Sequence, residues 1–166
     1  MNERVLDMPQ ELKTQIRYGS WLHDCGKIGM GEVILNKEST LTNDEIEIIR
    51  RHPVWGAEVA RQAHLSQEVI NIIACHHERF DGQGYPTGIS GEDIPREARI
   101  VSIADVFDAI TTDRSYHAKR SVPEAIEVMS FLGGSAFDPD FLDIFLSCVE
   151  NTYIEIHGDC DYGNRE

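Results

Sequence analysis

Two pairs of adjacent residues in this sequence could each supply ligands to metal ions. The first pair is His23 and Asp24, and the second is His76 and His77, which precede a loop reading ERFDGQGYP. Neutral imidazoles and carboxylates suit Fe, Mn or Zn. Neighbours on a helix project about 100° apart, so each pair reaches two ions, or one ion and a supporting group, more naturally than it chelates one. The two pairs therefore indicate a binuclear metal centre.

Two further residues fit the same centre. His52 lies at an expected helix junction, and Asp105 lies near the middle of a helical segment, residues 97–113, that is apolar on nearly all sides. Burying a carboxylate there is costly unless it is paired, hydrogen-bonded or bound to metal. A buried cap or salt-bridge acceptor explains Asp105 as well as metal ligation does. A lone helical histidine is usually an ordinary surface or core residue, so the combination of positions carries the prediction.

The elements that must position these residues are helices separated by breakers. The first expected helix begins near residues 7–9 and ends at Gly26. Thr42 with Glu45, and Ser121 with Glu124, form capping boxes that open two others. Further helices are expected to begin near Pro53, after Ser66, near residue 97 and at residues 138–139, whereas residues 79–96 are too rich in Gly and Pro. Without a convincing strand alternation, the predicted fold class is all-α.

Length and composition predict one globular domain spanning residues 1–166, with a motif-bearing core at about residues 6–153 and a flexible tail at 154–166. The formal net charge of −14 argues against binding to nucleic-acid polymers or anionic membranes. No apolar run approaches the roughly 18 residues needed to span a bilayer, so no membrane insertion is expected and a cytoplasmic location is predicted.

The cysteines predict free thiols rather than disulfides. The four residues show no CxxC spacing, and two of them fall within apolar helical patterns, which favours buried thiols in a reducing compartment. Cys25 and Cys75 each adjoin a ligand pair, but adjacency on a helix does not turn a side chain toward the metal. Both are interpreted as core residues.

Four segments in order resemble the HD-GYP branch of the HD-domain metal phosphohydrolases. They read HDCGKIG (23–29), RHP (51–53), HHERFDGQGYP (76–86) and RIVSIADVFDAITTDRSY (99–116), and the match extends from about residue 6 to about 146. Each segment alone is a weak signal, whereas the ordered set is highly specific.

The resemblance implies an HD-domain helical bundle that holds two or three Fe or Mn ions and cleaves cyclic di-GMP with a metal-activated water. It implies a bridging, catalytic role for Asp24 and a phosphate contact for Lys27. It also implies that Arg114 binds a substrate phosphate or guanine, and that the loop borders the site and a signalling partner domain. The implied metal ligands are His23, Asp24, His52, His76, His77 and Asp105. The loop residues are Gly82, Gly84, Tyr85 and Pro86, with Tyr85 also a candidate for substrate binding.

Several of these roles have simpler alternatives. A lysine after a helix end, such as Lys27, is favoured by the macrodipole alone. Arg114, near Lys119 and Arg120, is also explained by a solvated basic patch. Tyr85 is equally suited to a packing lid, and turn geometry suffices for the loop glycines.

The sequence also departs from the resembled pattern. Family members carry another histidine about 30 residues before the HD pair, yet only 22 residues precede His23 and none is a histidine. Either the sequence begins late or the missing ligand comes from elsewhere. His52, His76, His77 and Asp24 then form a complete first site, and the second site is expected to be incomplete. Cys25, Gly31, Ser115 and His117 are also unusual, and the last two weaken the expected substrate contact of the 114–117 region.

The preferred function is metal-dependent hydrolysis of a cyclic dinucleotide, with three alternatives. One is an HD phosphohydrolase acting on another nucleotide, which a substrate panel would separate from the first. Another is a signalling and partner-binding module that has lost turnover, as the missing upstream histidine suggests. The third is a structural helical domain whose histidines occur by chance, which metal-free purified protein would favour.

Overall fold

The computed structural model describes residues 8–31, 34, 37, 39–113 and 119–157. The described part is helical, as predicted, and its β content is a single isolated bridge between Gly133 and Phe137. The helices are α2 (Gln10–Leu22), α4 (Asn43–Ile49), α5 (His52–Gln62), α6 (Gln67–Cys75), α7 (Arg96–Thr111), α8 (Val122–Ser130) and α9 (Pro139–His157), with short 3-10 turns η1 (Cys25–Gly29) and η2 (Gly91–Asp93).

The helix starts follow local sequence signals. Thr42 and Ser121 form the predicted capping boxes of α4 and α8 with Glu45 and Glu124. The Ser66 side chain accepts from the backbone of Val69 at the start of α6. These caps satisfy backbone N–H groups that have no partner inside the helix, so the local sequence defines where these helices begin.

Two boundaries differ from the sequence prediction. The first helix ends at Leu22 instead of continuing to Gly26, because the chain tightens into η1 from Cys25. Residues 154–157 were expected in a flexible tail but are helical, since α9 continues through His157. Residues 158–166 lie outside the described part of the chain.

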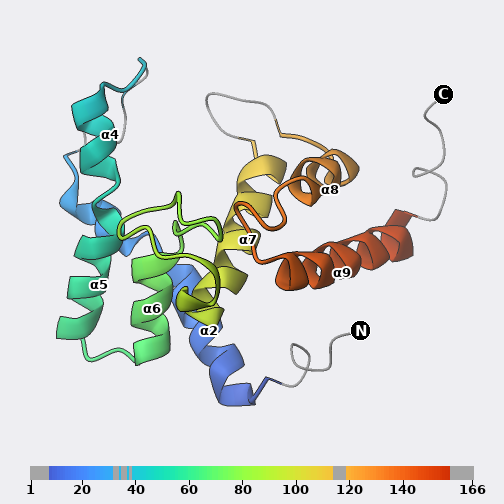
Figure 1. The fold of residues 1–166 in the computed structure, drawn as a ribbon, viewed down its shortest axis with the longest axis horizontal. Helices are drawn as coiled ribbons and strands as arrows, with labels where there is room; N and C mark the ends of the chain where they lie inside the picture. Colours follow the sequence, from blue (N-terminus) through green and yellow to red (C-terminus); the bar gives the residue numbers. More distant parts are fainter. Residues whose placement is uncertain (1–7, 32–33, 35–36, 38, 114–118, 158–166) are drawn as a thin grey trace.

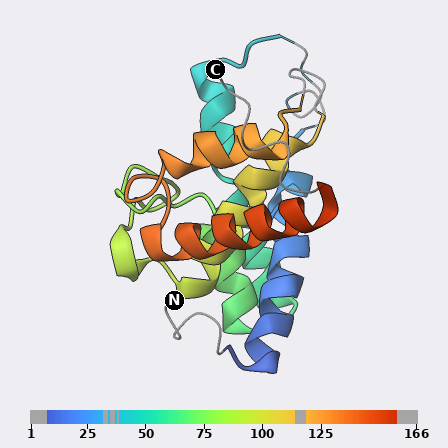
Figure 2. The ribbon, with the colours of Figure 1, turned by 90° about the vertical axis from the view of Figure 1, so that its right-hand side faces the viewer.

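The helices pack on both sides of α7. In Figure 1, α2, α5 and α6 lie on one side of α7, and α8 and α9 lie on the other. Contacts between α2 and α6, α5 and α6, and α6 and α7 join the first group, and η1 packs against α5. In Figure 2, α8 and α9 lie across α7. The carboxylate of Asp105, halfway along α7, is thereby brought toward the first group.

Two hydrophobic clusters support these layers. One contains Ala57, Ala60, Val69, Ile70 and Ile73 from α5 and α6. The other contains Ile103, Met129, Phe137, Leu142 and Leu146, around α7, α8 and α9. Burying these side chains supplies the main favourable free energy for packing the helices.

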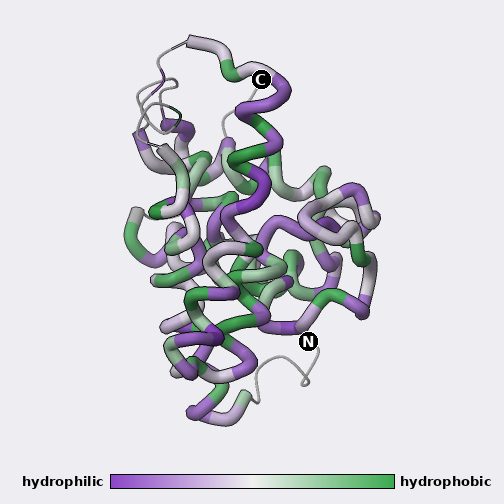
Figure 3. The backbone as a smooth tube through the Cα atoms, turned by 90° about the vertical axis from the view of Figure 1, so that its left-hand side faces the viewer, coloured by the Kyte–Doolittle hydropathy of each residue, from purple (hydrophilic) through white to green (hydrophobic). Residues whose placement is uncertain are grey.

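Hydrophobic and hydrophilic residues alternate along the helices in Figure 3. Among the described residues, none of the helices combines the length and apolar character needed to cross a membrane. The alternation is that of helices with one face turned to a protein core.

Candidate metal centre

Side chains from several elements meet at one end of the α2–α5–α6 layer. His23 is the residue after α2, Asp24 lies between α2 and η1, and His52 is the first residue of α5. His76 and His77 follow α6. One ligand atom from each of Asp24, His52, His76 and His77 lies within 4.8 Å of the others, so these four residues could hold one metal ion.

Asp24 lies at the middle of this arrangement, and its two oxygens face different groups. Oδ1 is 3.2 Å from His52 Nε2 and 4.0 Å from His76 Nε2. Oδ2 is 3.4 Å from His23 Nε2 and 2.5 Å from Lys27 Nζ. A carboxylate with this geometry can bridge two cations.

Asp105 completes the second group. Its Oδ1 lies 3.5 Å from His23 Nε2, so His23 Nε2 is close to two carboxylates. The structure therefore brings together all six residues that were predicted as metal ligands, four in a compact cluster and His23 with Asp105 beside them.

Three of the imidazole rings are held by backbone carbonyls one helical turn earlier. Nδ1 lies 2.6 Å from Ser20 O in His23, 2.8 Å from Ile49 O in His52 and 3.0 Å from Ile73 O in His76. A carbonyl can only accept, so each Nδ1 carries the proton and donates it. In His52 and His76, Nε2 is then turned toward Asp24 with its lone pair available, as in histidines that ligate metals. In His23, Nε2 faces the carboxylates of Asp24 and Asp105.

The cluster fits a divalent cation because acceptor atoms converge there. The Nε2 atoms of His52 and His76 are 3.2 Å apart, and with both protons on Nδ1 neither nitrogen can donate to the other. Asp24 Oδ1 is buried beside them and makes no hydrogen bond of good geometry. Buried acceptors without donors are costly. A cation with nitrogen and oxygen ligands would satisfy all three atoms at once.

Burial and neighbouring charges shift the pKa values of the histidines in opposite directions. Burial, together with the nearby His77, lowers the pKa of His76 to about 3, and burial lowers the pKa of His77 to about 4. Contacts with Asp105 and Asp24 instead raise the pKa of His23 to about 10. His76 and His77 are therefore neutral at neutral pH and available as candidate ligands, whereas a cation would have to compete with a proton at His23.

The carboxylates stay ionised despite their surroundings. Burial alone would raise the pKa of Asp24, but contacts with His23 and with the Lys27 ammonium outweigh it and hold the pKa far below its ordinary value. The pKa of Asp105 is also lowered, because its contact with His23 outweighs burial. The two ionised carboxylates can therefore serve as oxygen ligands to a divalent cation.

The loop after His77 is fastened by Glu78, a residue to which the sequence analysis assigned no role. This carboxylate is buried and accepts hydrogen bonds from Thr87 N at 2.7 Å, Thr87 Oγ1 at 2.6 Å and Gly88 N at 3.0 Å. No local sequence signal marks these partners, because they lie nine and ten residues farther along the chain. Glu78 thus ties the far end of the loop to the residue beside a candidate ligand.

Position 84 requires glycine because the loop passes close to the backbone of His77 and Glu78. A Cβ at this position would lie 2.5 Å from Glu78 Cα and 2.6 Å from His77 O, and both of these atoms are backbone. Gly82 has a φ of 77°, in the left-handed region where glycine is favoured. Turn geometry therefore explains Gly82, whereas Gly84 allows the loop to approach His77 directly.

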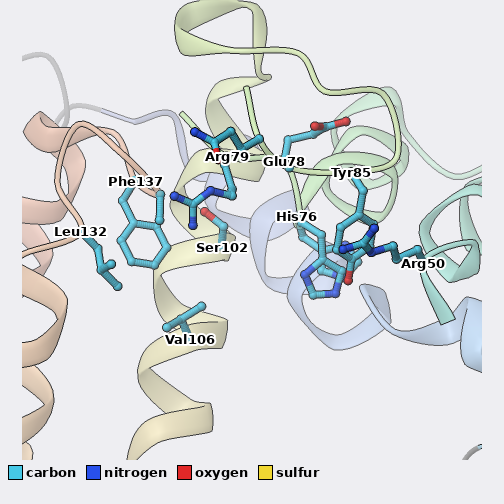
Figure 4. A pocket seen from close by; sticks show the side chains of 13 residues that line it. Arg50, His76, Glu78, Arg79, Tyr85, Ser102, Val106, Leu132 and Phe137 are labelled. Atoms are coloured by element: carbon cyan, nitrogen blue, oxygen red, sulfur yellow. The ribbon is translucent and has the colours of Figure 1, made fainter. Parts of the chain in front are cut away.

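Tyr85 is turned into the site. Its ring stacks on the His77 ring with 4.7 Å between centroids, and its backbone N–H donates to His77 O at 3.1 Å. The Arg50 guanidinium lies 5.6 Å from the Tyr85 ring centre on the approach to the site (Figure 4). The peptide bond from Tyr85 to Pro86 is cis. Tyr85 is therefore packed against a candidate metal ligand, next to a cation that the sequence analysis did not single out.

Removing the Tyr85 ring should weaken metal binding, because this ring stacks on His77 and helps to hold the imidazole in place. We expect Tyr85→Ala to lower the affinity for Mn²⁺ by about tenfold, the lower end of the effect of losing a group that supports a ligand. Tyr85→Phe keeps the stacked ring and should retain near wild-type affinity. Calorimetric titration with Mn²⁺ measures both. An equal loss in Tyr85→Phe would assign the effect to the hydroxyl group instead.

The remaining residues from the sequence prediction are Arg114 and the cysteines. Arg114 lies outside the described residues, so its substrate contact stays a prediction.

The cysteines lie apart from the candidate ligands. Cys25 packs against the α5–α6 cluster, and burial raises the pKa of Cys75 to about 11. Neither belongs to the four-residue cluster. Cys25, Cys75 and Cys148 are free, but the expectation of a buried thiol is wrong for Cys148, which is exposed on α9.

Comparison with known protein families identifies the family to which this chain belongs. The HD domain family matches residues 2–141. The chain belongs to the HD domain family. Membership confirms the resemblance found in the motifs, and the HD domain implies that a divalent metal binds, consistent with the cluster around Asp24.

This chain is similar to two proteins named as cyclic di-GMP phosphodiesterases. It is 39% identical over 147 residues to a cyclic di-GMP phosphodiesterase of Pseudomonas aeruginosa, covering 88% of this chain and 35% of that protein. It is 40% identical over 143 residues to the cyclic di-GMP phosphodiesterase response regulator RpfG of Xanthomonas campestris, covering 85% of this chain and 38% of that protein. The chain thus spans little more than a third of the length of these relatives.

A solved structure shares the fold. A cyclic GMP-AMP specific phosphodiesterase of Vibrio cholerae superposes with a TM-score of 0.70 at 24% identity, covering 94% of this chain and 42% of that one. The similarity confirms the helical HD-domain fold, and at this identity it concerns the fold alone.

Proposed function

We propose that this HD domain is a metal-dependent phosphodiesterase that hydrolyses a cyclic dinucleotide, with cyclic di-GMP as its substrate. The observation that carries the proposal is the Asp24 carboxylate, whose oxygens face His52 and His76 on one side and His23 on the other. Such a carboxylate suits a two-metal site for phosphodiester hydrolysis. The names of the two relatives from Pseudomonas and Xanthomonas support the substrate class.

The resident cations would be Fe or Mn, held by Asp24 and the five other candidate ligands around it. His52, His76 and His77 with Asp24 would hold the first, and His23, Asp24 and Asp105 the second. Mixed imidazole and carboxylate ligands suit these metals. When bound, such ions lower the pKa of a coordinated water and offset the negative charge that develops on the phosphoryl oxygens.

The protein side chains would bind and orient the substrate. The Lys27 ammonium lies against Asp24 with its side chain 41% exposed, so it can exchange that contact for a phosphate oxygen. The geometry supports this role over a simple macrodipole effect, because the ammonium contacts Asp24, the proposed bridging ligand. Tyr85 and Arg50 border a cavity that His76 and His77 also line, where ring and guanidinium surfaces can contact a nucleotide.

The two metal positions should differ in affinity. Four residues serve the first position, and their ligand atoms already lie within 4.8 Å of one another. Three described residues serve the second, and one of them, Asp24, is shared. Fewer neutral imidazoles mean weaker binding of Fe or Mn, so the first position should fill before the second.

A metal titration of chelated protein tests whether turnover needs metal and whether it needs both positions filled. Turnover of cyclic di-GMP to the linear dinucleotide or GMP should be absent after exhaustive chelation and should return with Mn²⁺ or with Fe²⁺ under anaerobic conditions. Activity should rise with the second equivalent rather than the first, because a lone ion cannot clamp both reacting oxygens. Product chromatography measures turnover, and metal analysis measures the number of bound ions. Full turnover in metal-free protein would exclude the proposal.

Cyclic GMP-AMP is the second candidate substrate, because a 3'3'-cGAMP-specific phosphodiesterase of Vibrio cholerae is 37% identical to this chain over 133 residues. Comparing the two dinucleotides in the same assay separates the candidates. A contact between the 82–86 loop and a signalling partner domain stays a prediction. The inward position of Tyr85, stacked on His77, supports a role for the loop inside the site.

A further inference from the structure

The loop that follows His77 is anchored on both sides of Tyr85. On one side, the Tyr85 N–H itself donates to His77 O at 3.1 Å. On the other side, the N–H groups of Thr87 and Gly88 donate to the Glu78 carboxylate at 2.7 Å and 3.0 Å. The two acceptors belong to consecutive residues, so the backbone before and after the Tyr85 side chain is fixed to the same point of the chain.

Thr87 contributes its side chain to this anchor as well as its backbone. Its hydroxyl donates to Glu78 Oε1 at 2.6 Å, beside the bond from its own N–H to the same oxygen. Glu78 is only 4% exposed. Hydrogen bonds to a charged acceptor are stronger than neutral ones, and loss of a donor is more costly where water cannot replace it. The side chains of Glu78 and Thr87 thus form a clasp across the loop.

The ring of His77 is held differently from those of the other three candidate histidine ligands. A backbone carbonyl fixes Nδ1 of His23, His52 and His76. Within the described part of the chain, the structure shows no such bond to the His77 ring. Its ring contacts are with other rings, among them Tyr85, which stacks on it with 4.7 Å between centroids and 28° between planes. The orientation of His77 therefore depends on where the Tyr85 ring lies.

We propose that Glu78 and Thr87 are positioning residues for the metal centre. Their clasp holds Tyr85 against His77 and thereby sets the orientation in which His77 meets a metal ion. The inference rests on the metal centre of the proposed function. A ligand that is already oriented binds an ion more tightly, because less ordering accompanies binding, and groups that support a ligand affect metal affinity for this reason.

Two substitutions of Thr87 separate the clasp from the rest of the loop. Thr87→Val keeps the shape of the side chain and the backbone N–H but removes the hydroxyl, whereas Thr87→Ser keeps the hydroxyl. Thr14→Val is the matched control, because the Thr14 hydroxyl donates to Gln10 O at the start of α2, the end opposite His23. Calorimetric titration gives the affinity of the tighter Mn²⁺ site in each variant, and thermal unfolding of the metal-free protein gives its stability.

Thr87→Val should lower the Mn²⁺ affinity by about tenfold, the lower end of the effect of losing a group that supports a ligand. Thr87→Ser should restore near wild-type affinity, and Thr14→Val should leave it unchanged. A clasp that only stabilises the fold would lower the melting temperature of Thr87→Val without changing the Mn²⁺ affinity of the folded protein, and that result would overturn the proposal. An equal loss of affinity in Thr87→Ser would overturn it as well, because the hydroxyl would not be the group that matters.

A double variant tests whether the clasp acts through Tyr85. Tyr85→Ala removes the ring that the clasp holds, so adding Thr87→Val should weaken Mn²⁺ binding no further. Additive losses, about 100-fold in the double variant, would show two independent effects and overturn the route through Tyr85. Turnover of cyclic di-GMP by the wild type is measured in the same preparations. Absence of turnover would contradict the proposed function, whereas the Mn²⁺ affinities of the variants decide the role of the clasp.

Discussion

Replacing Asp24 by Asn should eliminate turnover of cyclic di-GMP and empty both metal positions. The substitution keeps the size of the side chain but removes the negative charge that faces His52 and His76 through one oxygen and His23 through the other. Loss of a supporting group alone weakens metal binding by about 10–100-fold, so loss of a bridging ligand should exceed about 100-fold. The rate should fall further still, because both ions contribute to the reaction.

Metal analysis and product chromatography of Asp24→Asn test this prediction, with Asp143→Asn as the control variant. Asp143 is exposed on α9, away from the cluster, and its replacement should leave metal content and rate unchanged. Normal metal content and turnover in Asp24→Asn would show that the carboxylate does not bridge the ions.

Gly26→Ala should disrupt the site without altering any ligand. Gly26 lies in η1, and a Cβ there would overlap His52 O and lie 2.5 Å from Gly56 N, both backbone atoms of α5. Backbone atoms cannot move aside as a flexible side chain can, so η1 and α5 must separate. This movement would draw Asp24 away from His52. Overpacking of this kind costs about 1–3 kcal/mol of unfolding free energy, and a backbone clash belongs at the upper end of that range.

The expected result is a clear drop in melting temperature together with weaker Mn²⁺ binding and lower turnover. Gly31→Ala is the matched control, because a Cβ at Gly31 would meet nothing within 4 Å. That variant should behave as wild type in all three measurements. A Gly26→Ala protein with wild-type stability and metal affinity would mean that close contact between η1 and α5 is not what holds Asp24 beside His52.

The sequence alone determined the helical class, most helix starts and the six candidate ligands. Caps are local, since Thr42 and Ser121 bond to residues only three positions away. Local hydrogen bonds leave a readable pattern in the chain. The candidate ligands were recognisable because paired histidines and carboxylates recur in an ordered set of motifs. The end of the first helix was predicted wrongly, since the change to a 3-10 turn at Cys25 brings η1 against α5, a tertiary contact.

Only the tertiary structure decided how these residues are used. It placed Asp105 beside His23, where the carboxylate both pairs with a histidine and adjoins the cluster. It turned Tyr85 onto His77, fastened the loop through Glu78, and brought Arg50 to the edge of a cavity whose far wall comes from residues 132–137. These partners are separated by many residues along the chain. Which of them meet depends on how the helices pack, and packing responds to the shape of the whole core rather than to any short segment.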